Sequence, residues 1–131
     1  MKILFVSSTG IYVKYQDDQS VRYRSLSHIE NFDKKNIFAK FTPQSLFEKN
    51  NINEFDAYIF HRPLFNNIFE KKISYLHSLN KIIIADYDDI VFGEENFQYS
   101  FLGKRISPSN EELKKLISLF NNFSKGLELF N

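Results

Sequence analysis

Residues 81–92 read KIIIADYDDIVF, a short apolar run that leads directly into three carboxylates. Ile82 to Ala85 has the length and β-branched content of a buried strand. Asp86, Asp88 and Asp89 follow at once, and carboxylates so close together repel one another unless a cation, a hydrogen-bond donor or solvent offsets their charge. In an open parallel α/β sheet, ligands bind outside the carboxyl ends of the strands. The stretch therefore predicts a strand of the fold and one wall of a ligand site.

Strand and helix patterns alternate along the rest of the chain. Apolar runs of strand length occur four times, and segments with helical periodicity lie between and after them. This order predicts a parallel sheet with right-handed crossovers and helices on both faces. We therefore expect an α/β fold, a Rossmann-like three-layer αβα sandwich with a mainly parallel sheet of about four to five strands. The predicted strands are 3–8, 36–42, 56–61 and 81–85, and the predicted helices are 20–32, 45–53, a segment after Pro63, and 109–126.

The segment 109–130 carries the clearest helix signals. Ser109 and Glu112 have the spacing of a capping box, in which each side chain satisfies a backbone N–H of the other residue. Gly126 is expected to end this helix. The apolar run that follows Gly126 looks like the start of a further element, so we expect residues 1–131 to be a single Rossmann-like domain of a longer polypeptide. The apolar stripe of the predicted helix consists of Leu113, Leu116, Ile117, Phe120 and Phe123.

The composition limits the functions that need to be considered. With 131 residues, of which 43% are hydrophobic and 25% charged, the chain has the size and composition of one globular domain. A net charge of +1 gives no reason to expect a nucleic-acid partner. The absence of cysteine excludes thiolate zinc sites and cysteine nucleophiles, and it fits a cytoplasmic protein. No run approaches the roughly 20 apolar residues of a membrane-spanning helix.

Polar residues follow every predicted strand. The first strand leads into Ser7-Ser8-Thr9-Gly10, the second ends at Thr42, the third runs into His61-Arg62 and the fourth into Asp86. Because the carboxyl ends of parallel strands meet at one edge of a sheet, we expect these groups to converge. The alternative interpretation is that strand ends simply meet water, as loops generally do.

Two of these groups are candidates for binding an anion. Gly10, with Thr9, could let backbone amides approach a ligand phosphate. A single glycine falls well short of a dinucleotide fingerprint or a P-loop, so a plain tight turn is the alternative. Arg22 and Arg24 flank Tyr23 near the start of the first predicted helix, where either could clamp an anion or lie on a solvated helix face.

His61 and Arg62 directly follow a predicted strand. Histidine can act as a base or a donor near neutral pH, and arginine is a fixed cation. Arg62 could therefore contact a ligand, or it could pair internally with Asp86 or Asp88. The sequence alone leaves both interpretations open.

The acidic cluster allows three interpretations. Its carboxylates could hold magnesium or manganese, they could bind sugar hydroxyls or a cation, or they could be structural, with Asp86 capping a loop and Asp88 and Asp89 in solvent. His28 and His77 fall in predicted helices, where a surface or core position is the simpler interpretation. The sequence contains no histidine pair with zinc spacing.

With these residues in view, the chain resembles the amino-terminal domain of GT-B-type glycosyltransferases, the family-4-like group used in bacterial surface polysaccharide assembly. The likeness covers nearly the whole chain and depends on the order of several soft motifs. These are Lys2-Ile-Leu-Phe-Val-Ser-Ser8, Tyr23-Arg24, Asp56-Ala-Tyr-Ile-Phe-His-Arg62 and Ile84-Ala-Asp-Tyr-Asp-Asp-Ile-Val-Phe92.

The resemblance implies two Rossmann-like domains in the complete enzyme, of which the amino-terminal one holds the acceptor and the other holds the nucleotide sugar. The chain departs from the family pattern in two ways. It lacks the paired-glutamate signature of the donor domain, and the glycine-rich loop after the first strand is reduced to Thr9-Gly10. The implied reaction is the attack of an acceptor hydroxyl on the anomeric carbon of a nucleotide sugar, with no metal and no other cofactor.

We therefore expect residues 1–131 to be the acceptor-side half of a sugar transferase and to be inactive alone. The expected partners are a glycan or lipid-linked acceptor and, through a second domain, a nucleotide-sugar donor, with peripheral contact at the inner face of the membrane. The predicted catalytic residues are His61, Asp86 and Asp88, and the predicted substrate-binding residues are Thr9, Gly10, Arg22, Arg24, Arg62 and Asp89.

Two other functions stay open. Residues 86–92 are similar to the first motif of haloacid-dehalogenase-like phosphatases, in which the first Asp is the nucleophile, the second is the acid and magnesium sits between them. Ile90 stands where that family has Thr, and the motif comes late in the chain, so the likeness is partial. A non-catalytic Rossmann-like binding module is the other alternative.

Overall fold

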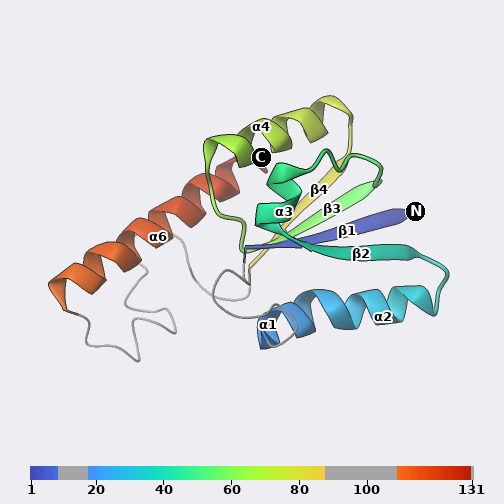
Figure 1. The fold of residues 1–131 in the computed structure, drawn as a ribbon, viewed down its shortest axis with the longest axis horizontal. Coiled ribbons are helices and arrows are strands. Elements are labelled where there is room, and N and C mark those ends of the chain that lie inside the picture. The colour runs from blue at the N-terminus through green and yellow to red at the C-terminus, as the bar shows by residue number, and fades with distance from the viewer. Residues whose placement is uncertain (9–17, 88–108, 131) are drawn as a thin grey trace.

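The computed structural model describes residues 1–8, 18–87 and 109–130, and its centre is a four-stranded sheet (Figure 1). All the strand pairs are parallel, and the strand order is β2-β1-β3-β4. This arrangement confirms the predicted α/β, Rossmann-like sandwich. The strands are β1 (Lys2–Ser7), β2 (Phe38–Pro43), β3 (Ala57–His61) and β4 (Ile82–Asp86).

Helices lie on both sides of this sheet (Figure 1). One helical segment, with a π-helical turn in its middle, precedes β2 and lies on one side, while α3 and α4 lie on the other. The helix α3 ends at Lys49 and not at the predicted residue 53, because Asn50 is extended and its side-chain amide donates to the Leu46 carbonyl (2.8 Å). The bounds are α1 (Gln19–Val21), η2 (Arg22–Leu26), α2 (Ser27–Asp33), α3 (Gln44–Lys49), α4 (Asn67–Ser78) and α6 (Asn110–Glu128).

One face of the sheet, the closed face, carries Leu4 and Val6 of β1 and Tyr58 and Phe60 of β3. Side chains alternate between the two faces along a strand, so these four point together toward α3 and α4. Phe60 is fully buried, and its ring meets two further phenylalanine rings edge-on at centroid distances of 5.3 Å. Apolar burial of this kind is the main source of stability. The other buried members of this core are Phe47, Phe55, Phe69, Ile73 and Leu76.

The opposite face, the open face, is covered only in part. Ile3 and Phe5 of β1 pack against α2, and the Phe5 ring stacks on Phe32 at 6.3 Å. On the same face of β4, Ile82 and Ile84 are 55% and 46% exposed. The helical segment that joins β1 to β2 lies over those two strands, and β4 is at the far side of the sheet. Helices thus lie on both faces, as predicted, but the cover of the open face does not extend to β4.

The last helix begins as the sequence predicts. Ser109 Oγ accepts a hydrogen bond from the Glu112 N–H (3.4 Å), and the Ser109 N–H donates to the Glu112 carboxylate (2.9 Å). The hydrogen bonds from the Ser109 side chain and backbone lower the pKa of the Glu112 carboxyl. Phe120 and Phe123 of the predicted stripe are buried. The capping box and the apolar stripe are therefore confirmed.

The predicted end of this helix at Gly126 is wrong, because α6 continues to Glu128. A Cβ at Gly126 would lie 2.8 Å from the Pro63 carbonyl oxygen. The glycine thus allows close contact between α6 and the β3–α4 connection, and it does not terminate the helix. After Gly126, Leu129 and Phe130 pack against the closed-face core, with the Phe130 ring 5.5 Å from that of Phe60.

Candidate functional site

The strand order places a topological switch point between β1 and β3. The chain leaves β1 toward β2 on one side and then crosses back to β3 on the other side of β1. Ligands of open α/β sheets bind at the carboxyl edge of such a crevice. Ser7 and His61, the last residues of β1 and β3, are register partners at this edge, and Asp86 of β4 is the register partner of His61.

Ser7 and His61 contact each other at this edge, and both are buried. Ser7 Oγ lies 3.0 Å from His61 Nδ1, and both residues are only 1% exposed. The tautomer of the imidazole decides which of these two atoms donates. The contact ties the ends of two strands together beneath the surface. This burial favours a positioning role for His61 over direct contact with a surface ligand.

Ser8 and Arg62 shape the backbone just beyond these strand ends. The Ser8 N–H donates to the His61 carbonyl (3.3 Å), and the Ser8 hydroxyl donates to the Arg62 carbonyl. Arg62 has a φ of 48°, a left-handed conformation that residues with side chains seldom adopt. Its N–H donates to the Asp86 carbonyl (2.9 Å). Unfavourable backbone conformations of this kind cluster at functional sites, and here hydrogen bonds from two neighbouring strands hold one in place.

Arg24 reaches across the open face to the end of β4. Its Nη1 lies 3.2 Å from Asp86 Oδ1, and the side chains of Arg24 and Asp86 are 41% and 24% exposed. Arg24 belongs to the π-helical turn η2, a wide turn that is often found at functional sites. The pair therefore presents one cation and one anion, both reachable from solvent, at the carboxyl edge.

The same π-helical turn buries a hydroxyl group. Ser25 is fully buried, and its Oγ has no hydrogen-bond partner among the residues the structure describes. An unsatisfied buried polar atom costs about 1–3 kcal/mol. The turn thus places a buried hydroxyl next to the residue that contacts Asp86.

A groove on the open face leads up to the Arg24–Asp86 pair. Its volume is about 330 Å³, at the lower end of the range for small-molecule sites. The His28 ring stacks on Phe5 with a centroid distance of 6.2 Å and an interplanar angle of 2°. The groove, which we call the sheet groove, is lined by Phe5, Arg24, His28, Phe32, Ile59, Ile84, Ala85 and Asp86.

The structure brings four predicted site residues together at one edge: Arg24, His61, Arg62 and Asp86. With Ser7 and Ser8 they form what we call the carboxyl-edge site. Thr42, the residue before the end of β2, is buried, and its hydroxyl lies 3.4 Å from the Pro43 carbonyl. Arg22 is exposed, and its carbonyl accepts from the Ser27 hydroxyl (3.0 Å). The predicted residues Thr9, Gly10, Asp88 and Asp89 lie outside the described residues.

Sequence reasoning did not identify the sheet groove. It predicted a surface or core position for His28, which is exposed, and did not predict that the ring also lines the groove. It also treated Phe5, Ile59 and Ile84 only as strand residues. The sequence could have indicated the groove, because side chains alternate between the two faces along each strand. Once β1, β3 and β4 are paired in register, Phe5, Ile59 and Ile84 share one face.

Tyr87 follows Asp86 and connects the site to α6. Its hydroxyl lies 3.4 Å from the Pro63 carbonyl and 3.4 Å from the Phe123 carbonyl. Burial raises the pKa of the Tyr87 phenol far above its ordinary value, so the ring stays neutral. The residue thus packs the end of β4 against α6, and this contact has a structural role.

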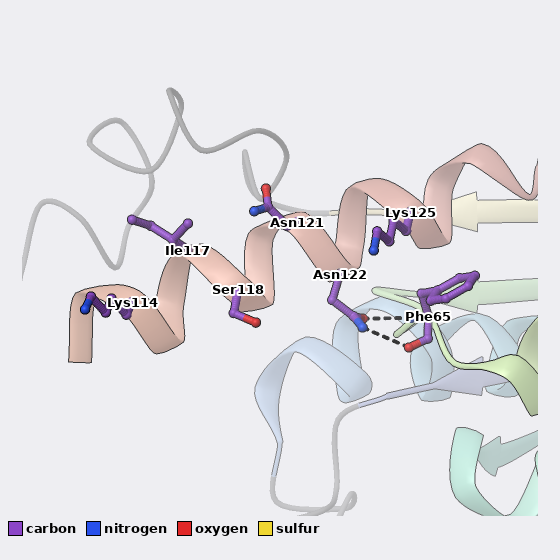
Figure 2. Close-up of a pocket in the computed structure, with 7 residues that line it drawn as sticks. All are labelled: Phe65, Lys114, Ile117, Ser118, Asn121, Asn122 and Lys125. Atoms are coloured by element: carbon purple, nitrogen blue, oxygen red, sulfur yellow. Dashed lines mark hydrogen bonds between the residues drawn. The ribbon is translucent and has the colours of Figure 1, made fainter. Parts of the chain in front are cut away.

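A second hollow of about 390 Å³ lies between α6 and Phe65 (Figure 2). The Asn122 side chain accepts from the Phe65 N–H and donates to the Phe65 carbonyl, both at 2.8 Å. Lys114 and Lys125 line the hollow, but both are exposed and lie about three helical turns apart. Its polar contacts therefore join α6 to the β3–α4 connection, and the carboxyl-edge site has the stronger features of a binding site.

Comparison of the chain with protein families, curated proteins and solved structures finds no match. No helix in the described ranges is long and apolar enough to cross a membrane. Within residues 1–8, 18–87 and 109–130, no group of three or more histidine and acidic side chains gathers as a metal site would require. The carboxyl-edge site is therefore the basis for a functional proposal.

Proposed function

We propose that the chain binds a sugar-bearing acceptor at the carboxyl-edge site, as the acceptor-side half of a glycosyltransferase. The observation that carries this proposal is the solvent-accessible Arg24–Asp86 pair at the mouth of the sheet groove, beside the switch point of the sheet. In the cell such an enzyme would act in the cytoplasm, at the inner face of the membrane.

The chemistry of the site suits a sugar. A sugar hydroxyl can donate to the Asp86 carboxylate and accept from the Arg24 guanidinium, since both groups are partly exposed. The apolar C–H face of a sugar ring can lie against the apolar lining of the groove, which includes Phe5 and Ile84. Arg62, at the same edge, adds a cation for any charge on the acceptor.

In the complete reaction, the acceptor hydroxyl would attack the anomeric carbon of the nucleotide sugar. The new C–O bond forms as the bond to the nucleotide diphosphate breaks, and the hydroxyl proton passes to a base within hydrogen-bond reach. Of the predicted bases, Asp86 lines the groove and is partly exposed, whereas His61 is buried. We therefore assign proton acceptance to Asp86 and the positioning of the β1 and β3 ends to His61. The donor nucleotide would bind to a second domain.

Calorimetric titration with a panel of disaccharides and a short-chain polyprenyl-diphosphate sugar tests the proposal. Asp86→Asn and Arg24→Gln should each weaken binding of the best ligand at least tenfold, about 1.4 kcal/mol. Asp33→Asn, an exposed acid at the end of α2, is the matched control and should leave Kd unchanged. Equal affinities of wild type, Asp86→Asn and Arg24→Gln would contradict the proposal.

A non-catalytic binding module is the second candidate, favoured by the burial of His61 and by the contact that Asp86 already makes with Arg24. A transfer assay tests both candidates, since neither predicts catalysis by residues 1–131 alone. Residues 1–131 alone should not turn over a nucleotide sugar, and detectable transfer would contradict the half-enzyme proposal. Magnesium-dependent hydrolysis of a phosphate ester that is lost in Asp86→Asn would instead support the phosphatase alternative.

A further inference from the structure

The two outermost strands of the described sheet differ in how they discourage pairing with another strand. β2 has Lys40 within it and Pro43 at its end, and the Lys40 ammonium lies 5.2 Å from the centre of the Phe38 ring. Charged side chains and proline are the usual means by which an edge strand avoids further pairing. β4 has no proline, and its charged residue, Asp86, stands at its carboxyl end. Between Ile82 and Ala85 the described edge therefore carries only apolar side chains, which favours pairing with another strand.

Backbone hydrogen bonds fix which peptide groups of β4 point outward. The Ile82 N–H donates to the Asp56 carbonyl (3.1 Å), and the Asp86 carbonyl accepts from the Arg62 N–H (2.9 Å). Even-numbered residues of β4 therefore direct their peptide groups toward β3. Successive residues alternate, so Ile83 directs its N–H and carbonyl away from β3, toward the outer edge.

The side chains of the same strand add an apolar surface at this edge. Ile82 and Ile84 lie two positions apart on the open face and are 55% and 46% exposed. A strand that lies antiparallel to β4 would place side chains directly beside them, on the same face. A second β4 supplies isoleucines with this same spacing.

We propose that β4 pairs antiparallel with β4 of a second copy of this chain, about a two-fold axis at Ile83, so that the described four-stranded sheets of the two copies become continuous. The two Ile83 residues exchange both of their outward N–H···O=C hydrogen bonds. Ile82 of each copy then lies opposite Ile84 of the other, as a non-hydrogen-bonded pair with a Cα separation of about 4.5 Å. This surface borders the proposed acceptor site, since Ile84 also lines the sheet groove, but the pairing does not depend on the acceptor function.

The position of the charged residue Asp86 favours this register over the neighbouring one, in which the two-fold axis lies at Ile84. Both registers keep the isoleucine side chains of the two copies on the same face. An axis at Ile84 would set Asp86 directly against Ile82 of the other copy and bury a carboxylate beside an apolar side chain. The axis at Ile83 instead places Asp86 beyond the start of the other copy's β4, near the turn that contains Asn80, and leaves the contact with Arg24 in place. Among the described residues 80–86, no two like charges face each other in this arrangement.

The expected association is weak. A single pair of short strands buries less than the roughly 1,200 Å² at which stable interfaces begin. Sedimentation equilibrium of the full chain should give a mass near 15.6 kDa at low micromolar concentration and a rise toward twice that mass as the concentration approaches millimolar. Ile84→Lys should abolish the rise, while Ile68→Lys, at a 57% exposed site on α4, should not alter it.

Cysteine pairs test the register, because the chain has no cysteine of its own. Ile82→Cys mixed with Ile84→Cys should form a cross-linked dimer in oxidised glutathione at least tenfold faster than either variant alone, since only the mixture brings directly opposite positions together. A wild-type mass that stays monomeric to millimolar concentration overturns the proposal. So does dimerisation that Ile84→Lys leaves intact, or cross-linking with no preference for the mixture.

Discussion

The closed and open faces of the same sheet differ in what their side chains do. On the closed face, residues of β1 and β3 meet α3 and α4 in a core from which solvent is excluded. On the open face, α2 covers β1 and β2, while β4 leaves two isoleucines and the sheet groove accessible. Both faces are built from the same kind of apolar strand, so the difference comes from where the connecting helices lie. One face stabilises the fold, and the other leaves surface available for binding.

The largest effect should come from the closed face. Phe60→Ala removes a fully buried ring and should lower the free energy of unfolding by about 3–5 kcal/mol, measured by urea denaturation. Ile84→Ala on the open face is the comparison, and it should lower the free energy of unfolding by less than about 1 kcal/mol, since nearly half of that side chain is exposed. Equal losses in the free energy of unfolding for the two variants would contradict the difference in packing between the closed and open faces.

Stability should be nearly as sensitive to a substitution at the contact between α6 and the β3–α4 connection. Alanine normally stabilises a helix relative to glycine by about 1 kcal/mol. At Gly126 the added Cβ would meet the Pro63 carbonyl at 2.8 Å, so Gly126→Ala should instead destabilise the fold by about 1–3 kcal/mol. Thermal and urea denaturation both measure this. A stabilised Gly126→Ala variant would show that α6 is not held closely at this point.

The buried contact between Ser7 and His61 in the carboxyl-edge site should have the next largest effect on stability. Ser7→Ala removes the hydroxyl that contacts His61 Nδ1 and should lower the free energy of unfolding by about 1–2 kcal/mol. The imidazole resonances of His61 should shift in the same variant, whereas those of exposed His77 should not. Unchanged His61 resonances would contradict the contact.

Arg24 should affect binding far more than stability. A partly exposed ion pair contributes about 0–1 kcal/mol, so Arg24→Gln should change the free energy of unfolding by no more than that. Its acceptor affinity should nevertheless fall at least tenfold. A loss of stability much larger than about 1 kcal/mol would make Arg24 a structural residue of the open face.

The smallest effect should have the opposite sign. Ser25→Ala removes a buried oxygen that lacks a partner among the described residues, and it should leave the stability unchanged or raise it by up to about 1 kcal/mol. A clear loss of stability in urea denaturation would show that the Ser25 hydroxyl makes a favourable interaction in solution.

Local sequence patterns predicted the elements of this fold well, because the strands and long helices are periodic and α6 has a capping box. They failed at Gly126, whose role depends on a contact with Pro63 that is distant in the sequence. The same patterns predicted that His61, Arg62 and Asp86 meet at one edge, since parallel pairing of the strands decides this. The pairing of Asp86 with Arg24 and the partial cover of the open face depend on where the first helical segment lies, which no local pattern reports.

Amide chemical-shift mapping with the best acceptor ligand tests the central claim most directly. If the carboxyl-edge site binds the acceptor, the largest changes in amide chemical shift should occur at Ser8, Arg24, Arg62 and Asp86. The closed-face residues Phe47 and Leu76 should remain unperturbed, and Asp86→Asn should suppress the shifts at equal ligand concentration. Shifts centred on the closed face, or on the hollow beside Phe65, with none at the carboxyl edge would contradict the account.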